Sequence, residues 1–228
     1  KKNKIKYLVT HSSDEADNEI ILGVNDESLL ENQNIISSSI CDANAASHFI
    51  KMINDEYGIK NGSLTTLHPW LSYQNLVDGP SLSISKPDFI WPDYSLGRAS
   101  IGNLIPKNTT AMTVLEKVIP EIKNKFISFS FRIPTDVVAA ADITIVANKK
   151  INNKDFTEFI NNKCKNSKYV SQNFKSLVSS DYKQTEYSGI LDMQWVKTKN
   201  ELIKLVIWYD NEWAYSCRVL DLAKKMLN

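Results

Sequence analysis

Cys41 lies at the start of a predicted helix, a position where a cysteine can be chemically reactive. It comes where an extended run at residues 34–36 gives way to an amphipathic helix, whose apolar residues recur at helical spacing as far as Tyr57, and Gly58 supplies the stop. A sulfur in the first turn of a helix lies at the positive end of the helix dipole and near unpaired N–H groups, which both favour the thiolate. Cys41 is therefore a candidate nucleophile. The alternative is a small buried residue, as most free cysteines are.

A candidate base for this cysteine is His68, at the end of the segment TTLH. The alternative is a histidine at the end of a strand whose ring is hydrogen-bonded to backbone. His48 follows Cys41 on the same helix, but it is about two turns away and cannot reach the sulfur. Cys41 and His68 together predict covalent catalysis by a thiol and a base.

Composition excludes several classes of function. The chain has 228 residues, of which 43% are hydrophobic, so it can bury the core of one large domain or two small ones. A net charge of +1 with scattered basic residues predicts no nucleic-acid partner. No apolar run approaches the roughly 20 residues of a membrane span, and residues 1–4 do not resemble the start of a signal peptide.

The cysteines and glycines set further limits. The 3 cysteines are odd in number and share no motif spacing, which predicts free thiols in a reducing compartment and no metal site. The 7 glycines form neither a G-x-G-x-x-G turn nor a P-loop, so the chain has no nucleotide-phosphate loop of its own.

The periodicity of apolar residues predicts an α+β fold with a mostly antiparallel sheet. Strands are expected at 6–9, 19–24, 63–68, 126–132 and 137–147, a hairpin at 187–209, a long loop at 72–96, and helices at 109–119, 155–164 and 211–227. In the final helix, Trp213, Cys217, Leu220 and Met226 are expected near one face. Trp208, Tyr209 and Trp213 are expected in the core.

Beyond these patterns, segments of the chain resemble, in the same order, those of the glyceraldehyde-3-phosphate dehydrogenase family. They are CDAN at 41–44, TTLH at 65–68, VDGPS at 77–81, NLIP at 103–106, KVIPE at 117–121, FRIPT at 131–135, VSSD at 178–181 and WYDNE at 208–212. The resemblance implies that residues 41–228 are a catalytic domain with helices on one face of a mixed sheet. It also implies that residues 1–40 are the last strands of a Rossmann-type NAD(P)-binding domain. The rest of that domain would precede Lys1, and the final helix, from about residue 211, would pack back toward it.

The family resemblance also implies a reaction. The Cys41 thiolate adds to a sugar aldehyde, hydride passes to NAD or NADP, and the resulting thioester passes to phosphate or water, with His68 as the base. Arg132 would bind the substrate phosphate, and Thr109 and Thr110 a second anion. Such enzymes are cytoplasmic homotetramers of glycolysis, with a small aldehyde as partner.

Two of the roles that the resemblance implies have simpler alternatives. Arg132 could instead pair with Asp136 or Asp142. By the resemblance, Asn211 would orient the nicotinamide carboxamide, whereas from its position it could simply cap the final helix.

Departures from the family pattern concern phosphate. Ile40 and Asp42 replace a serine and a threonine on either side of the cysteine, Leu96 replaces an arginine, and Leu71 and Tyr73 replace threonines. At about 5 Å and an effective dielectric of about 20, the Asp42 carboxylate repels each unit of negative charge by roughly 3 kcal/mol. Phosphate is therefore predicted to be a poor acyl acceptor.

Three other hypotheses follow from these residues. One is hydrolysis of the thioester to a free acid, as in the erythrose-4-phosphate branch of the family. Another is a non-catalytic binding or assembly protein that keeps the scaffold. The last is a cysteine hydrolase on an unrelated fold.

Overall fold

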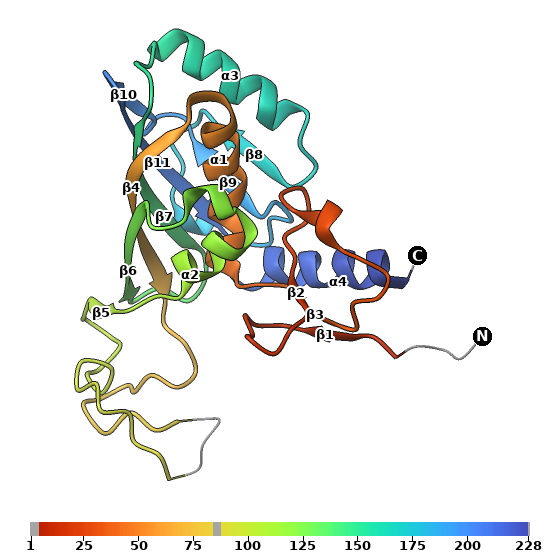
Figure 1. Cartoon of the computed structure of the whole chain (residues 1–228). Coiled ribbons are helices and arrows are strands. Elements are labelled where there is room, and N and C mark those ends of the chain that lie inside the picture. The colour runs from red at the N-terminus through yellow and green to blue at the C-terminus, as the bar shows by residue number, and fades with distance from the viewer. Residues whose placement is uncertain (1–4, 84–87, 228) are drawn as a thin grey trace.

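The computed structural model describes residues 5–83 and 88–227. Residues 1–4, where a signal peptide was not expected, and residues 84–87 of the expected long loop lie outside this part. Figure 1 shows one large curved sheet with helices packed against it, and a small sheet beside the last helix. Among the described residues, no helix has both the length and the apolar character that crossing a membrane requires.

The large sheet confirms the predicted α+β class. Its strands run in the order β5-β6-β4-β7-β11-β9-β8, with β10 paired to β11. All pairs are antiparallel except β4 with β6 and β8 with β9. The strands are β4 (Ile59–Pro69), β5 (Ile105–Lys107), β6 (Phe126–Ile133), β7 (Ala139–Ala147), β8 (Val170–Asn173), β9 (Gly189–Asp192), β10 (Lys197–Lys199) and β11 (Leu202–Tyr209).

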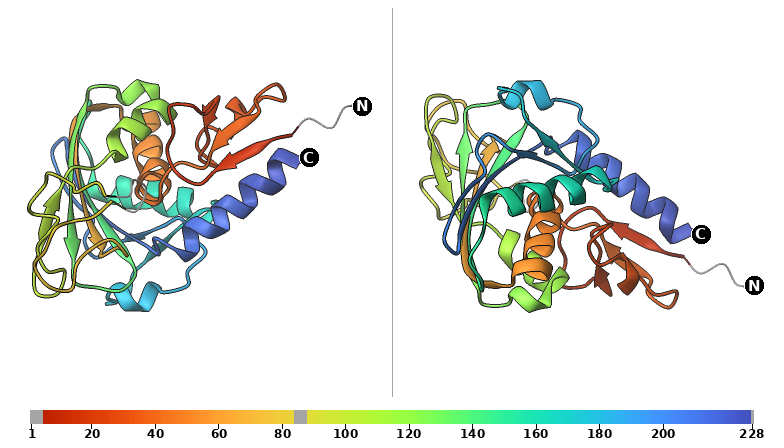
Figure 2. Two further views of the ribbon diagram at one scale, coloured as in Figure 1. Left: turned by 90° about the horizontal axis from the view of Figure 1, so that it is seen from below. Right: turned by 90° about the horizontal axis from the view of Figure 1, so that it is seen from above.

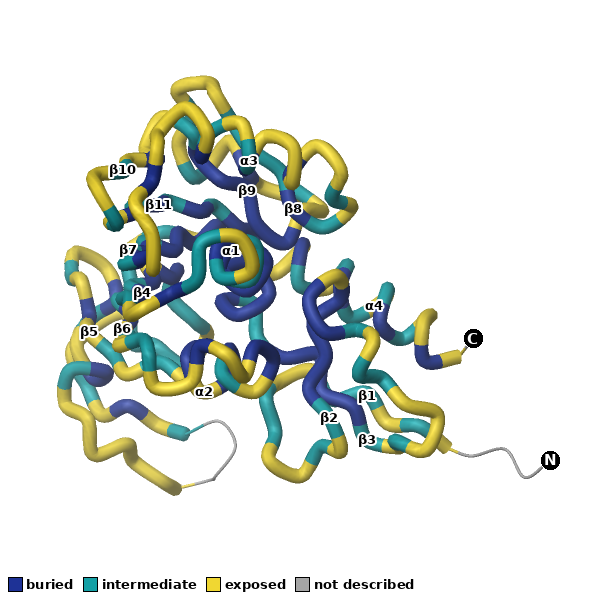
Figure 3. The backbone as a smooth tube through the Cα atoms, turned by 45° about the horizontal axis from the view of Figure 1, so that its top comes forward, coloured by how far each residue is buried: buried dark blue, intermediate teal, exposed yellow. Residues whose placement is uncertain are grey.

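One face of this sheet forms the core. Along β7 and β11, buried residues alternate with more exposed ones, as expected of a sheet that is covered on one side. The helices α1 (Cys41–Tyr57), α2 (Ala111–Val118) and α3 (Asn153–Lys165) cover that face, and both views in Figure 2 show them on the same side. Buried backbone gathers around α1 and the neighbouring strands (Figure 3).

The start of α1 is formed as predicted. Cys41 is its first residue, and Gly58 ends it with a φ of 66° while donating its N–H to the Asn54 carbonyl at 2.9 Å. A positive φ at this point favours glycine, because the Cβ atom of any other residue would clash with the neighbouring backbone. Short 3₁₀ turns lie at Asp26–Ser28, Pro120–Ile122 and Ser179–Tyr182.

A second, parallel sheet is built from the N-terminal residues. It contains β1 (Tyr7–Val9), β3 (Ile35–Ser37) and β2 (Asn18–Glu19), in that order across the sheet. The predicted strand at 19–24 is wrong beyond Glu19. The Asn25 side chain accepts from the Ile21 N–H at 2.8 Å and donates to the Glu19 carbonyl at 2.9 Å, so a turn replaces the strand ladder.

The last helix, α4 (Trp213–Leu227), packs on this small sheet. Leu222 and Met226 join Ile20, Leu22 and Ile36 in a separate apolar cluster. This contact explains why α4 lies beside β1–β3 in Figure 1.

The prediction that Trp213 of α4 lies in the core is wrong. Trp213 is 47% exposed and Leu220 is 61% exposed, while Ala214, Arg218, Leu222 and Met226 are buried. Arg218 can occupy the interior because its guanidinium donates to the Glu186 carbonyl at 3.0 Å and to Asp221 at 2.7 Å. A pattern of apolar residues alone does not reveal a buried arginine.

Candidate active site

The turn before α1 aims the Cys41 side chain. Ser39 has a φ of 67°, and the chain is extended at Ile40 before the helix begins at Cys41. Tyr215 of α4 donates its hydroxyl to the Ser39 carbonyl at 2.9 Å. Asn44, one turn into α1, donates its amide to the Ile40 carbonyl at 3.0 Å. Side chains from both helices therefore fix the turn that carries the thiol.

His68 lies opposite this thiol, as predicted. It is buried near the end of β4, and its Nε2 atom is 3.6 Å from Cys41 Sγ. Its Nδ1 atom lies 2.8 Å from the Pro69 carbonyl oxygen. Because a carbonyl can only accept, Nδ1 carries the proton, and the lone pair of Nε2 faces the sulfur.

Asp42 is a third group at the same point, and it is buried. Its Oδ1 accepts from the Tyr209 hydroxyl at 2.7 Å and from the Cys41 thiol at 3.4 Å. Its Oδ2 lies 3.5 Å from the Thr66 hydroxyl, which also bonds Ser130 at 2.8 Å. The short bond from Tyr209 thus holds the carboxylate beside the sulfur.

Tyr209 is the functional residue that sequence reasoning missed. It is 1% exposed, as expected of a core residue, but its hydroxyl is the donor that fixes Asp42. The available signal was the buried charge itself, since a carboxylate at the first turn of a buried helix requires a donor. Trp213, expected in the core, lies half exposed at the start of α4.

The electrostatics of the site favour the uncharged forms of thiol and imidazole. Burial raises the pKa of the Cys41 thiol well above its usual value. The charge of Asp42 and its hydrogen bond raise this pKa further, against smaller opposite effects of the Asp42 N–H and of Arg132. Burial also lowers the pKa of His68, against the charge of Asp42. The helix dipole that was expected to favour the thiolate is therefore outweighed.

Arg132 borders the pair on the next strand. It is opposite His68 in the register of β4 and β6 and is 8% exposed. Its Nη2 donates to the Tyr73 hydroxyl at 3.4 Å, and its Nε atom has no hydrogen-bond partner among the described residues. Asp136 pairs instead with Lys183, and Asp142 with Lys204, so the alternative ion pairs for Arg132 are wrong.

The two threonines lie farther along the chain, between β5 and α2. Thr109 accepts from the Ala111 N–H at 3.1 Å through its hydroxyl, and Thr110 is exposed. Within the described residues, no hydrogen bond joins either threonine to Cys41 or Arg132. Their role at an anion site therefore stays a prediction.

Asn211 precedes α4 and is buried. Its Oδ1 accepts from the Val138 N–H at 3.1 Å, and Val138 has a φ of 71°, a strained conformation for a β-branched residue. Asp210, not Asn211, caps the helix, because its Oδ1 accepts from the N–H groups of Glu212 at 3.0 Å and Trp213 at 2.8 Å. The Nδ2 of Asn211 has no partner in the described part of the chain, so it is available as a donor to an amide-bearing ligand.

The family comparison agrees with this arrangement. Residues 40–211 match the family described as "Glyceraldehyde 3-phosphate dehydrogenase, C-terminal domain". The chain belongs to the glyceraldehyde-3-phosphate dehydrogenase family. Its Cys41–His68 pair lies inside the matched region.

Named relatives extend the match along the chain. Glyceraldehyde-3-phosphate dehydrogenase of Phytophthora infestans is 33% identical over 99% of this chain and 66% of that protein. Glyceraldehyde-3-phosphate dehydrogenase 3 of Saccharomyces cerevisiae is 33% identical over 90% of the chain and 60% of that protein. The cytosolic glyceraldehyde-3-phosphate dehydrogenase 3 of Zea mays is 35% identical over 90% of the chain and 59% of that protein. The chain thus spans about three fifths to two thirds of the length of these relatives.

The departures from the family pattern meet at the thiol and at Arg132. Asp42, where the resemblance predicts threonine, contacts the sulfur directly. Tyr73, also in place of a threonine, lies against the Arg132 guanidinium. Two threonines expected from the family are thus replaced, one by a carboxylate and one by a phenol that accepts from the arginine.

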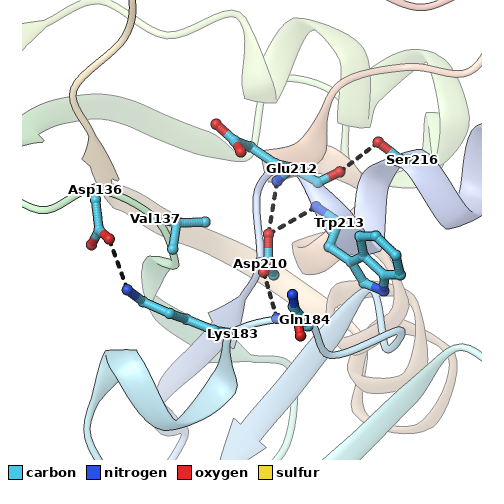
Figure 4. A pocket seen from close by; sticks show the side chains of 8 residues that line it. All are labelled: Asp136, Val137, Lys183, Gln184, Asp210, Glu212, Trp213 and Ser216. Atoms are coloured by element: carbon cyan, nitrogen blue, oxygen red, sulfur yellow. Dashed lines mark hydrogen bonds and ion pairs between the residues drawn. The ribbon is translucent and has the colours of Figure 1, made fainter.

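A cavity of about 760 Å³ lies beside the segment that contains Asn211, and Figure 4 shows its lining. Its polar groups are bonded to one another: Lys183 pairs with Asp136 at 2.7 Å, and Asp210 accepts from the Gln184 N–H at 2.8 Å. Neither Cys41 nor His68 lines it. We therefore assign the chemistry of the molecule to the Cys41 cluster and not to this cavity.

Proposed function

We propose that this chain is the catalytic part of an NAD(P)-dependent dehydrogenase that oxidises a phosphorylated sugar aldehyde through a thioester on Cys41. The observation that carries the proposal is the 3.6 Å contact between Cys41 Sγ and the unprotonated Nε2 of His68. A buried thiol that rests as the neutral form needs a base at the moment of attack, and His68 is in position to be that base.

The steps follow from this geometry. Nε2 takes the thiol proton as the sulfur forms a bond to the aldehyde carbon, and the carbonyl oxygen receives that proton to give a thiohemiacetal. His68 then takes the hydroxyl proton back as the carbon loses hydride and becomes the thioester carbonyl. Bound NAD or NADP supplies the hydride acceptor.

Two residues position the ligands in this proposal. Asn211 donates from Nδ2 to the nicotinamide carboxamide, because its Oδ1 is already bonded to the Val138 N–H. Arg132 binds the phosphate of the substrate, with its free Nε and its Nη2 as donors. Thr109 and Thr110 are proposed to bind a second anion from the rim of α2.

A second candidate concerns the acyl acceptor. The buried Asp42 carboxylate lies 3.4 Å from the sulfur, where it repels an approaching phosphate ion. We propose that water accepts the acyl group and that a free acid is released. This reading keeps the oxidation and changes only the final step.

The remaining proposals concern assembly and location. Residues 1–40 are proposed to complete a dinucleotide-binding domain, on which α4 packs through Leu222 and Met226. Ile127 and Phe129 on the outer face of the sheet are 73% and 44% exposed, which supports a second copy of the chain as the partner. A cytoplasmic location is proposed because the relative from Zea mays is named cytosolic.

The test is steady-state kinetics on the natural gene product with phosphorylated and plain aldehydes, with NAD and NADP, and with and without inorganic phosphate. We expect aldehyde-dependent reduction of one cofactor that is lost in Cys41→Ser and reduced at least 100-fold in His68→Asn. Reduction that persists in Cys41→Ser would contradict the covalent mechanism. Phosphate-dependent formation of an acyl phosphate would contradict water as the acceptor and leave the oxidation standing.

A further inference from the structure

Three side chains of the site, Cys41 itself included, carry atoms that metals bind. The Sγ of Cys41, a carboxylate oxygen of Asp42 and a ring nitrogen of His68 all lie within 4.8 Å of one another. We propose that these residues form a site for Zn²⁺, and that zinc bound there holds the nucleophile in an inactive form. The inference goes beyond the proposed function, because metal binding requires neither the aldehyde nor the cofactor.

The distances in the cluster fit tetrahedral zinc. Zinc–sulfur bonds of about 2.3 Å and zinc–nitrogen or zinc–oxygen bonds of about 2.0–2.2 Å place tetrahedral ligand atoms about 3.4–3.6 Å apart. Cys41 Sγ is 3.4 Å from Asp42 Oδ1 and 3.6 Å from His68 Nε2. Two edges of the required tetrahedron are therefore present before any metal enters.

The histidine is in the form that a metal needs. Its Nδ1–H donates to the Pro69 carbonyl at 2.8 Å, so the lone pair of Nε2 points at the cluster. Histidine ligands of metals characteristically donate their other N–H to a carbonyl or carboxylate, which fixes the ring. His68 thus presents the tautomer that zinc binds.

The carboxylate is held in the same way. Tyr209 donates to Oδ1 at 2.7 Å, and the Thr66 hydroxyl lies 3.5 Å from Oδ2. Hydrogen bonds of this kind orient ligating carboxylates and raise metal affinity. Tyr209 and Thr66 thus act as positioning residues, and Asp42 is 7% exposed, so little water competes for it.

The charges also balance. Zinc binding replaces the thiol proton, which is released to solvent, and the thiolate together with the Asp42 carboxylate cancels the two charges of the ion. Arg132, which borders the cluster, then faces a neutral group. Because Cys41 is only half-buried, a fourth position stays open for water, as in other zinc sites with three protein ligands.

The cysteines, odd in number and without a shared motif spacing, had predicted no metal site. The three proposed ligands come from the start of α1 and the end of β4, which only the fold brings together. Among the described residues, this is the one group of three or more such side chains that could hold an ion.

The experiment titrates ZnCl₂ into the metal-free natural gene product by calorimetry, in a background with Cys164→Ser and Cys217→Ser. We expect one zinc per chain with release of one proton. Co²⁺ in place of zinc is expected to give a sulfur-to-metal charge-transfer band that is lost in Cys41→Ser. Affinity is expected to fall at least tenfold in Asp42→Asn and about 10–100-fold in Tyr209→Phe.

Asp42→Thr is a second variant, with the residue that the family resemblance predicts at this position, and it is expected to lose affinity as Asp42→Asn does. Circular dichroism checks that each variant is folded. Unchanged zinc affinity in both Asp42 variants would overturn the three-ligand site, as would a Co²⁺ band that survives Cys41→Ser. These readouts contain no substrate, so their failure leaves the proposed dehydrogenase untouched, and failure of the dehydrogenase leaves them valid.

Discussion

The substitution Asp42→Asn isolates the charge that suppresses the thiolate of Cys41. Asparagine keeps the shape of the side chain and an oxygen that accepts from Tyr209, but it removes the negative charge 3.4 Å from the sulfur. At about 4 Å and an effective dielectric of about 20, two like charges repel by about 4 kcal/mol. Partial exposure of Cys41 and the nearby Arg132 reduce this repulsion, so a smaller net effect is expected.

Each 1.4 kcal/mol changes the population of thiolate tenfold. We therefore expect Asp42→Asn to lower the pKa of Cys41 and to accelerate its alkylation by iodoacetamide at pH 7 at least tenfold. The whole pH–rate profile should move to lower pH, because less base is needed to form the thiolate. The hydrogen bond from the thiol also weakens when its acceptor loses its charge, which acts in the same direction.

The assay measures alkylation rates by peptide mass mapping, with a chelator present and with Cys164→Ser and Cys217→Ser as background. Asp55→Asn is the matched control, since Asp55 lies on the same helix but pairs with Lys51 at the surface. Its rate should equal that of the background protein. An Asp42→Asn variant that is folded and reacts no faster would refute the assignment of Asp42 as the suppressing charge.

Three further predictions concern the buried His48, the phenol that donates to Asp42, and the response to inorganic phosphate. His48 is buried with its Nε2 unpartnered and has a pKa of about 3, against about 6.5 when unfolded, so the unfolded chain binds more protons between these values. The free energy of unfolding should fall by about 2 kcal/mol from pH 7 to pH 5, and urea titrations should show a smaller fall in His48→Gln. Tyr209→Phe leaves Asp42 Oδ1 without its phenol donor and should cost about 1–3 kcal/mol by the same titrations; an unchanged midpoint would contradict that role. Asp42→Thr combined with Leu96→Arg should increase the dependence of turnover on inorganic phosphate, and a flat phosphate titration of the double variant would count against the proposed anion site.

Local patterns predicted the parts of the molecule that local forces determine. The start of α1 at Cys41 and its end at Gly58 followed from helical spacing and from the conformational freedom of glycine. The pairing of Cys41 with His68 followed from residue types and from the family resemblance. These features depend on residues close together in the sequence or on motifs that a family shares.

The errors have a common physical cause: a polar side chain forms a hydrogen bond that no repeating pattern in the sequence reveals. Asn25 replaced the end of a predicted strand by bonding Ile21 and Glu19. Arg218 lies on the buried face of α4, because the Glu186 carbonyl accepts a hydrogen bond from its guanidinium. The bond from Tyr209 to Asp42 could not be found from periodicity, since no repeating pattern connects these two positions.

The two tyrosines that complete the site have a consequence for how the molecule is made. Tyr209 is 167 positions after Asp42, and Tyr215 is 176 positions after Ser39. Contacts of such high sequence separation form late in folding, and a chain emerging from the ribosome exposes its N-terminal part first. A growing polypeptide therefore carries a thiol and a carboxylate long before it carries the phenols that fix them. The synthesis of the segment that contains Tyr209 and Tyr215 is the step that turns an ordinary cysteine into an organised one.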